Sequence, residues 1–114
     1  MHESAMIDSF VDIVEKKVAE FDVKRVTKIK LKVGKLTCLA PTTLKNCFDV
    51  VAEERDLLRG AVLEVEEVPL KAECHQCHKV FLVENNLFSC PYCHHEQIKI
   101  VAGRELFIES VEVE

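Results

Sequence analysis

Two Cys-x-x-Cys pairs are the residues of this chain best suited to metal chemistry. Cys74 and Cys77 form the first pair, and Cys90 and Cys93 form the second. The segment between the pairs is long enough for a short hairpin that brings the four thiolates to one point, with Val80 to Phe88 at its centre. Four thiolates in a tetrahedral array suit zinc, at Zn–S distances of about 2.3 Å. The spacing therefore predicts a structural zinc site on these cysteines, with disulfides or free thiols as the alternative.

Four histidines flank these pairs: His75, His78, His94 and His95. Neutral imidazole is also a zinc ligand, but four thiolates already complete a tetrahedron. We interpret the histidines as neighbours of the site rather than ligands. Exchange of a histidine into the site with changing pH stays open as a hypothesis.

A second candidate metal site is the N-terminal tripeptide Met1-His2-Glu3. The Met1 amine, the His2 amide nitrogen and the His2 ring nitrogen can form fused chelate rings on one metal ion. The Glu3 amide or carboxylate can supply a fourth donor. Planar, nitrogen-rich coordination suits Ni²⁺ or Cu²⁺ better than zinc. Taken alone, this tripeptide is weak evidence for a metal site, because a histidine this close to a terminus most often belongs to a loose tail.

Composition limits the kind of protein that could carry these sites. The 114 residues are 48% hydrophobic and 31% charged, which indicates one globular domain, or a small domain carrying an insert. No apolar stretch is long enough to span a membrane, and no secretory signal is visible at the N-terminus. Six cysteines in such a chain favour a reducing cytoplasm. The net charge of -5 counts against a general nucleic-acid binder.

Hydrophobic periodicity predicts the elements of the first half of the chain. Residues 4–20 carry a helical stripe, made of Met6, Ile7, Phe10, Val14, Val18 and Phe21. Residues 26–33 alternate as a half-buried strand that Gly34 ends, with three lysines (28, 30 and 32) on its polar face. We interpret these lysines as a solvated row that pairs with glutamates of a neighbouring strand, with a docking surface as the alternative. A second helix begins at Pro41-Thr42, with Thr42 or Thr43 as its N-cap.

The second half of the chain completes the predicted fold. A strand at residues 61–65 continues to Pro69, and the cysteine module follows. A last strand covers residues 106–113, where the apolar phase changes between Ile108 and Val111 and predicts a β-bulge near Glu109 or Ser110. The fold class is therefore α+β, with two helices packed on a three-stranded mixed sheet and an inserted zinc-ribbon-like lobe. We expect residues 1–70 plus 103–114 to form an α+β domain that carries the candidate N-terminal metal site, and residues 71–102 to form the zinc-binding domain.

Several of these motifs occur together in one order along the whole chain. They are Met1-His2-Glu3, Val33-Gly34, Gly60-Ala61, the two cysteine pairs and the ending Ser110-Val111-Glu112-Val113-Glu114. In this combination the chain resembles the HypA/HybF family of nickel-insertion proteins for hydrogenase maturation. The cysteine spacing alone would not be specific, but its pairing with the N-terminal tripeptide is.

The resemblance implies a cytoplasmic metallochaperone rather than an enzyme. It implies that His2 binds Ni²⁺ with help from Glu3 and the Met1 amine, and that the four cysteines hold a structural zinc ion. It further implies delivery of nickel to [NiFe]-hydrogenase, with urease as another client. The implied partners are a HypB-type GTPase, the hydrogenase large subunit precursor and urease maturation proteins. Neither nucleic acid nor a membrane is implied, and family members are monomers or homodimers.

One departure from the family pattern is Ser4-Ala5, where a bulkier apolar residue commonly follows Met-His-Glu. It removes no ligand, so it bears on nickel affinity rather than on function. Cys47 lies on the apolar face of the second helix and is interpreted as core packing, whereas Cys38 has no assigned role. The alternatives to a metallochaperone are a zinc-ribbon nucleic-acid-binding or protein-interaction module and an iron–thiolate electron carrier.

Overall fold

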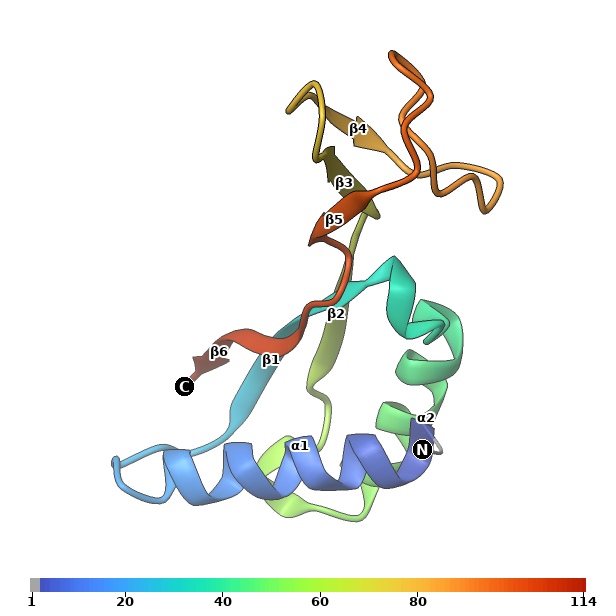
Figure 1. Cartoon of the computed structure of the whole chain (residues 1–114). Coiled ribbons are helices and arrows are strands. Elements are labelled where there is room, and N and C mark those ends of the chain that lie inside the picture. Colours follow the sequence, from blue (N-terminus) through green and yellow to red (C-terminus); the bar gives the residue numbers. More distant parts are fainter. Residues whose placement is uncertain (1–2) are drawn as a thin grey trace. The chain divides into compact units, whose positions relative to one another are not determined.

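The computed structural model describes residues 3–114, which divide into two compact units (Figure 1). The first unit takes its described residues from Met1–Lys32, Leu39–Glu66 and Phe107–Glu114. The second unit comprises Val33–Cys38 and Glu67–Leu106, and so includes segments on both sides of the cysteine module. No helix among residues 3–114 is both long and apolar enough to cross a bilayer.

Two helices belong to the first unit, α1 (Glu3–Val18) and α2 (Pro41–Glu53). The buried side chains of α1 recur every three or four residues, which is why this segment packs as an amphipathic helix: Met6, Ile7, Val11, Val14 and Val18. The predicted extension of this stripe to Phe21 is wrong, since α1 ends at Val18 and Phe21 is 64% exposed. The Phe21 N–H donates to the Val18 carbonyl across a tight turn that replaces the helical pattern.

The start of α2 differs from the prediction in one respect. Ala40, in an extended conformation, is the N-cap, and no side chain in the described part of the chain caps this end. Neither Thr42 nor Thr43 has the predicted capping role. Pro41 occupies the first helical turn, where its missing N–H costs no hydrogen bond and its fixed φ favours the helix. Leu44, Phe48 and Val51 are buried, and Cys47, predicted to pack in the core, is half-buried.

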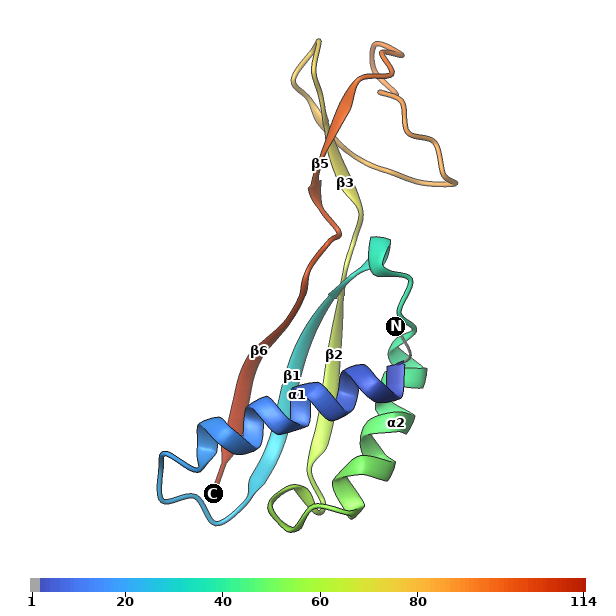
Figure 2. The same ribbon diagram turned by 60° about the horizontal axis from the view of Figure 1, so that its bottom comes forward.

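A three-stranded sheet runs in the order β2-β1-β6, with β1 (Val26–Gly34) between β2 (Val62–Val68) and β6 (Leu106–Val113). The β1 and β2 strands run in the same direction, since ion pairs join Lys28 to Glu64 and Lys32 to Glu66. The β6 strand runs opposite to β1, since Arg25 and Glu114 exchange backbone hydrogen bonds. In Figure 2, α1 crosses the strands of this sheet. This arrangement confirms the predicted two-helix, mixed-sheet fold.

The polar face of this sheet is a ladder of opposite charges. Lys28 lies 2.5 Å from Glu64, and Lys30 and Lys32 also contact Glu109 on β6, at 3.5 and 3.6 Å. Hydrogen bonding to Glu64 raises the pKa of Lys28, and the same contact lowers the pKa of Glu64. The predicted pairing of the lysine row with glutamates is confirmed. Glu112 adds a smaller electrostatic effect that also raises the pKa of Lys28. The β-bulge near Glu109 or Ser110 stays a prediction.

Arg55 links the two helices of the first unit. It follows α2 and donates hydrogen bonds to Asp12, at 2.9 Å, and to Glu15, while Asp8 lies 3.8 Å from its guanidinium. The three carboxylates occur at helical spacing on α1, so they form one stripe that a single guanidinium can bridge. The short helix η2 (Asp56–Leu58) follows and places Leu58 in the core.

The second unit is built on three short antiparallel strands: β3 (Lys71–Cys74), β4 (Val80–Leu82) and β5 (Ile98–Ala102), in the order β4-β3-β5. Its core consists of Leu70, Ala72, Cys74, Phe81, Val83 and Cys90. The pairing of β3 with β4 makes a hairpin whose turn contains the first cysteine pair, whereas the predicted hairpin lay between the two pairs. The sequence predicted no separate sheet here, because each strand is too short to show a periodic pattern.

The segment Val33–Cys38 joins this unit through a close backbone approach. Gly34 donates to the Glu105 carbonyl at 2.6 Å, and Leu36, in the short helix η1 (Lys35–Thr37), donates to the Gly103 carbonyl at 2.9 Å. A Cβ atom on Gly34 would meet the backbone of Gly103 and Arg104. Gly34 therefore ends β1, as predicted, at a position where only a residue without a side chain fits.

Candidate metal centre

The first cysteine pair lies in a tight turn after β3. The N–H groups of Gln76 and Cys77 donate to the Cys74 sulfur at 3.3 and 3.5 Å. The His78 N–H donates to the Cys74 carbonyl, and the Cys74 N–H donates to the Lys79 carbonyl, both at 3.0 Å. These bonds wrap the backbone around the Cys74 sulfur and direct Cys77 to the same side.

The second cysteine pair repeats this turn. The Tyr92 N–H donates to the Cys90 sulfur at 3.4 Å, the His94 N–H donates to the Cys90 carbonyl at 2.8 Å, and the Cys90 N–H donates to the His95 carbonyl at 2.9 Å. His78 and His94 occupy equivalent positions with φ of 61° and 65°. The left-handed region is unfavourable for side chains with a Cβ, so both turns are held by the hydrogen bonds around them.

The two turns bring four sulfur atoms together, all within 4.8 Å of one another. Cys74 and Cys93 are 3.5 Å apart at sulfur, and Cys77 and Cys90 are 3.6 Å apart. Sulfurs of a regular tetrahedron with arms of about 2.3 Å stand about 3.8 Å apart, so the cluster fits a tetrathiolate zinc ion. A disulfide needs sulfurs about 2.05 Å apart, and all four thiols are free.

The sulfur atoms also have the electrostatics of a ligand set. The Cys77 N–H, followed by the Gln76 N–H, lowers the pKa of Cys74 to about 6 against the opposing effect of burial. At Cys93 the N–H of His95 lowers the pKa, but burial and the thiolates of Cys74 and Cys90 outweigh it and raise the value to about 11. Without a cation, repulsion keeps these thiols from ionising together. A divalent ion at the centre removes that repulsion.

The neighbouring histidines do not join the cluster. Among residues 3–114, the one group of three or more potential ligands that could share an ion is the set of four cysteines. His75, His78 and His94 are exposed, and His95 is half-buried. A closed set of four thiolates leaves no coordination position for a substrate, so the site suits a structural rather than a catalytic metal.

Glu3 and Cys38 are not members of this cluster. Glu3 is the first residue of α1 and is half-buried, whereas Met1 and His2 lie outside the described residues. Cys38 is exposed, has a φ of 60° and donates its thiol to the Leu36 carbonyl at 3.7 Å. The sequence identified the cysteines by spacing but missed the backbone N–H donors around them. The repeated Cys-x-x-Cys-His pattern was the available signal for two equivalent turns.

The fold and the cysteine cluster together define a small α+β protein with four thiols placed so that they could hold one metal ion. Comparison with known proteins identifies its family. Residues 1–113 match the family model described as hydrogenase/urease nickel incorporation, metallochaperone, hypA. The chain is 38% identical over 114 residues to hydrogenase maturation factor HypA of Desulfitobacterium hafniense, covering 100% of this chain and 99% of that protein. It is 32% identical to hydrogenase maturation factor HybF of Escherichia coli K12, with all of both chains covered.

Two solved structures share the fold. The solution structure of a HypA protein has a TM-score of 0.74 at 22% identity, covering 100% of this chain and 97% of that one. The solution structure of the Ni metallochaperone HypA from Helicobacter pylori has a TM-score of 0.67 at 21% identity, covering 99% and 97%. The chain belongs to the HypA/HybF family of hydrogenase maturation nickel metallochaperones, which confirms the resemblance seen in the sequence. It is a maturation factor and not a catalytic enzyme.

Proposed function

We propose that this chain binds Ni²⁺ at its N-terminus and delivers it for the maturation of [NiFe]-hydrogenase, while Cys74, Cys77, Cys90 and Cys93 hold a structural zinc ion. The observation that supports this most directly is the match to the nickel-incorporation family along nearly the whole chain, in a sequence that begins Met1-His2-Glu3. Urease is a second destination for the nickel, in keeping with the description of the family.

The nickel donors in this proposal are the Met1 amine, the amide and ring nitrogens of His2, and the Glu3 amide or carboxylate. The start of α1 at Glu3 makes the Glu3 amide a suitable donor. The first N–H groups of a helix have no intrahelical acceptor, so a metal can replace the Glu3 amide proton without breaking a helical hydrogen bond. Four nitrogen donors in a plane suit Ni²⁺ better than Zn²⁺, because Zn²⁺ prefers a tetrahedral arrangement of ligands.

Zinc has a different task in this proposal. The core of the second unit contains six buried residues, two of which are cysteines of the cluster. A core this small stabilises a short segment poorly by itself. Structural zinc supplies roughly 10–16 kcal/mol of coupled folding free energy in small modules. Zinc on the four cysteines therefore maintains the second unit, and it is not the ion that is delivered.

Nickel can be delivered because its proposed ligands are terminal residues of the chain. Nickel held by residues 1–3 can pass to an acceptor by exchange of ligands, without unfolding of either unit. The proposed partners are a HypB-type GTPase, the hydrogenase large subunit precursor and urease maturation proteins, in the cytoplasm. Protons compete for the amine, the imidazole and the amides, so nickel affinity falls as the pH falls.

The test is calorimetric titration of Ni²⁺ into the zinc-loaded protein and three variants. His2→Ala should lose the specific nickel site while the fold is retained. One extra residue before Met1 should also weaken binding, because it moves the free amine away from His2. His75→Ala, which removes an exposed histidine near the cysteines, serves as the matched control and should bind nickel like the parent chain.

A further variant, Glu3→Gln, distinguishes the two possible fourth donors. Unchanged affinity would assign the fourth position to the Glu3 amide, and a weaker site would assign it to the carboxylate. Unchanged nickel binding by His2→Ala would disprove the site, and unchanged binding by the extended chain would disprove the role of the Met1 amine.

A further inference from the structure

The two cysteine turns come from separate segments of the second unit. The first turn connects β3 to β4, and the second follows β4 after a loop of residues 83–89. Backbone hydrogen bonds close each turn on itself, from Cys74 to residues 78–79 in the first and from Cys90 to residues 94–95 in the second. These bonds do not hold one turn against the other, so the four sulfurs depend on contacts between the turns.

Contacts at both ends of the first turn join it to the segment that carries the second. At its start, the His75 N–H donates to the Gln97 carbonyl at 3.0 Å, which continues the pairing of β3 with β5. At its end, the Lys79 ammonium lies 4.6 Å from the centre of the Tyr92 ring. Tyr92 lies within the second turn, where its N–H donates to the Cys90 sulfur. The contact of Lys79 with Tyr92 therefore connects the two turns directly.

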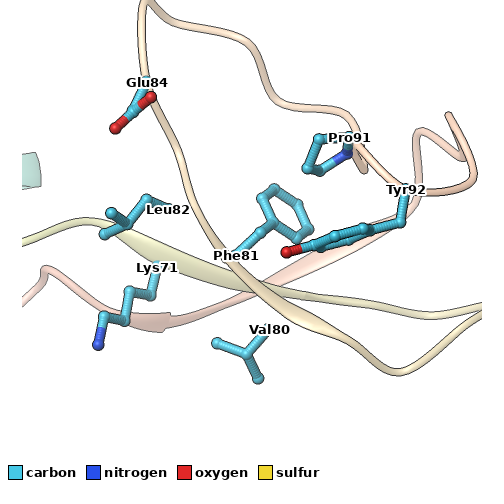
Figure 3. A pocket seen from close by; sticks show the side chains of 7 residues that line it. All are labelled: Lys71, Val80, Phe81, Leu82, Glu84, Pro91 and Tyr92. Atoms are coloured by element: carbon cyan, nitrogen blue, oxygen red, sulfur yellow. The ribbon is translucent and has the colours of Figure 1, made fainter.

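The side chains of this contact are suited to a cation–π interaction. An ammonium group within about 6 Å of a ring centre is attracted by the negative face of the ring. Tyr92 is 59% exposed, so its ring is open to a cation. Figure 3 shows the Tyr92 ring beside Phe81 and Pro91, and Phe81 belongs to the core of the second unit. Core packing therefore positions the ring, and the ring gives the exposed Lys79 a fixed place to bind.

The positive charge of Lys79 also suits this place. Four thiolates around one divalent ion leave an excess of negative charge. An ammonium group held on the second turn offsets part of that excess, because opposite charges attract more strongly near the protein than in bulk water.

We propose that Lys79 and Tyr92 are positioning residues of the metal site, which hold the two cysteine turns against each other around the bound ion. This inference rests on the zinc site of the proposed function. Neither side chain belongs to the cysteine cluster, so both act through the turns that carry the sulfurs. Their contact forms only when both turns are in place, and it therefore adds to the coupling between folding and metal binding. It also opposes the separation of the turns that must precede release of the ion.

The strength of cation–π contacts at exposed positions sets the expected size of the effect. Losing one such contact corresponds to about a two- to fivefold change in an equilibrium constant. Loss of the Lys79–Tyr92 contact should therefore weaken zinc binding by about this factor, without unfolding the zinc-loaded chain.

Competition titration of the full chain with a chromophoric zinc chelator tests the proposal. Lys79→Met keeps the aliphatic stem and removes the charge, so it should bind zinc about two- to fivefold more weakly than the parent. Lys79→Arg keeps a cation that can stack on the ring and should restore the affinity of the parent. Lys99→Met is the matched control, because Lys99 is an exposed lysine of the same sheet that lies on β5 opposite Glu73. It should bind zinc like the parent.

Variants of the ring test the other half of the contact. Tyr92→Phe keeps the aromatic face and should retain the zinc affinity, whereas Tyr92→Leu should lose about as much affinity as Lys79→Met. The double variant Lys79→Met/Tyr92→Leu should lose no more than either single variant, because both changes remove the same contact. In proton NMR spectra of the zinc-loaded parent, the ring current of Tyr92 should shift the Lys79 Hε resonances upfield, and Tyr92→Leu should abolish this shift.

The outcomes distinguish this contact from the zinc site on which it depends. Parent-like zinc affinity in Lys79→Met, or an equal loss in Lys99→Met, would overturn the positioning role and leave the zinc site standing. Additive losses in the double variant would also overturn it, because they would assign the two residues independent effects. A parent chain that binds no zinc at its cysteines would disprove the structural zinc itself, and this inference with it.

Discussion

Replacing Gly34 with alanine would place a methyl group against backbone atoms of a neighbouring segment. The added Cβ would lie 2.7 Å from the Arg104 nitrogen and closer still to the carbonyl group of Gly103. Real Cβ atoms essentially never approach other heavy atoms within 3.0 Å. These atoms belong to the main chain, so no rotation of a side chain can relieve the overlap.

The backbone at Gly103 has little room to move away from the added methyl group. Gly103 lies close to Leu70, since a Cβ on Gly103 would itself be 2.9 Å from the Leu70 Cα. Overpacking costs about 1–3 kcal/mol where neighbours can adjust, and this site should lie at the upper end, about 3 kcal/mol. The cost should appear as opening of the second unit, because Gly34, Leu70 and Gly103 all belong to it.

Amide hydrogen exchange is the appropriate assay, because it reports the local opening free energy of each hydrogen bond. The N–H groups of Gly34 and Leu36, which donate to Glu105 and Gly103, should lose about a hundredfold of their protection in Gly34→Ala, the equivalent of about 3 kcal/mol. Gly60→Ala is the control, because Gly60 has a φ of 84° and nothing within 4 Å of its added Cβ. It should cost only the left-handed strain, about 1–2 kcal/mol. Protection in Gly34→Ala equal to that in the parent chain would refute the steric argument.

Three other perturbations have definite expected outcomes. Arg55→Met should destabilise the first unit by about 1–2 kcal/mol in urea unfolding, because three carboxylates of α1 lose their shared cation; a midpoint unchanged from the parent would show that these pairs contribute nothing. Glu64→Gln should remove a pH dependence. The pKa of Glu64 is lowered in the folded chain, so its stabilising effect is present above about pH 4 and is lost as the pH falls through the folded pKa. The urea midpoints of the parent and Glu64→Gln should therefore converge in acid, and a constant difference would contradict the assignment. Cys74→Ala, or removal of the metal by a chelator, should unfold the second unit and leave the amide spectrum of the first unit largely intact; loss of both sets of signals would show that the units fold together.

The first unit could be predicted well because its elements follow regular periods. Strict alternation in residues 26–33 corresponds to buried Ile29, Leu31 and Val33 on β1. Periodicity did not fix the element ends. Phe21 continued the apolar spacing of α1 by chance, whereas local turn hydrogen bonds decide that the helix stops at Val18. The N-cap of α2 was misplaced because Pro41 allows the helix to start without a capping side chain.

In the second unit the four-cysteine cluster could be predicted from the sequence, but the sheet could not. Four cysteines at this spacing need only a local turn to converge, so the sequence predicted the cluster directly. The strands β3, β4 and β5 have three to five residues each, too few for a period-two signal. Their pairing depends on contacts between distant segments, such as Ala72 with Phe81 and Ile100, which no local pattern encodes. The proposed nickel donors Met1 and His2 lie outside the described residues, so that site stays a prediction.

The donor chemistry of the two proposed sites explains how one small chain can keep two similar divalent ions apart. Affinity differences among divalent ions are set mainly by the metal, so a protein selects by donor type and geometry. Cys74 and Cys90 are fully buried, and their sulfurs accept hydrogen bonds from a backbone that is folded around them. An ion held there can leave only if the second unit opens, which makes its release slow and costly. Of the proposed nickel donors in residues 1–3, Glu3 begins α1, and the first amide nitrogens of a helix have no helical hydrogen bond to lose. An ion bound at this proposed N-terminal site can exchange without any change in the fold. The two proposed sites therefore differ in how readily they release their ion, and this difference, more than a difference in affinity, distinguishes a structural ion from one that is delivered.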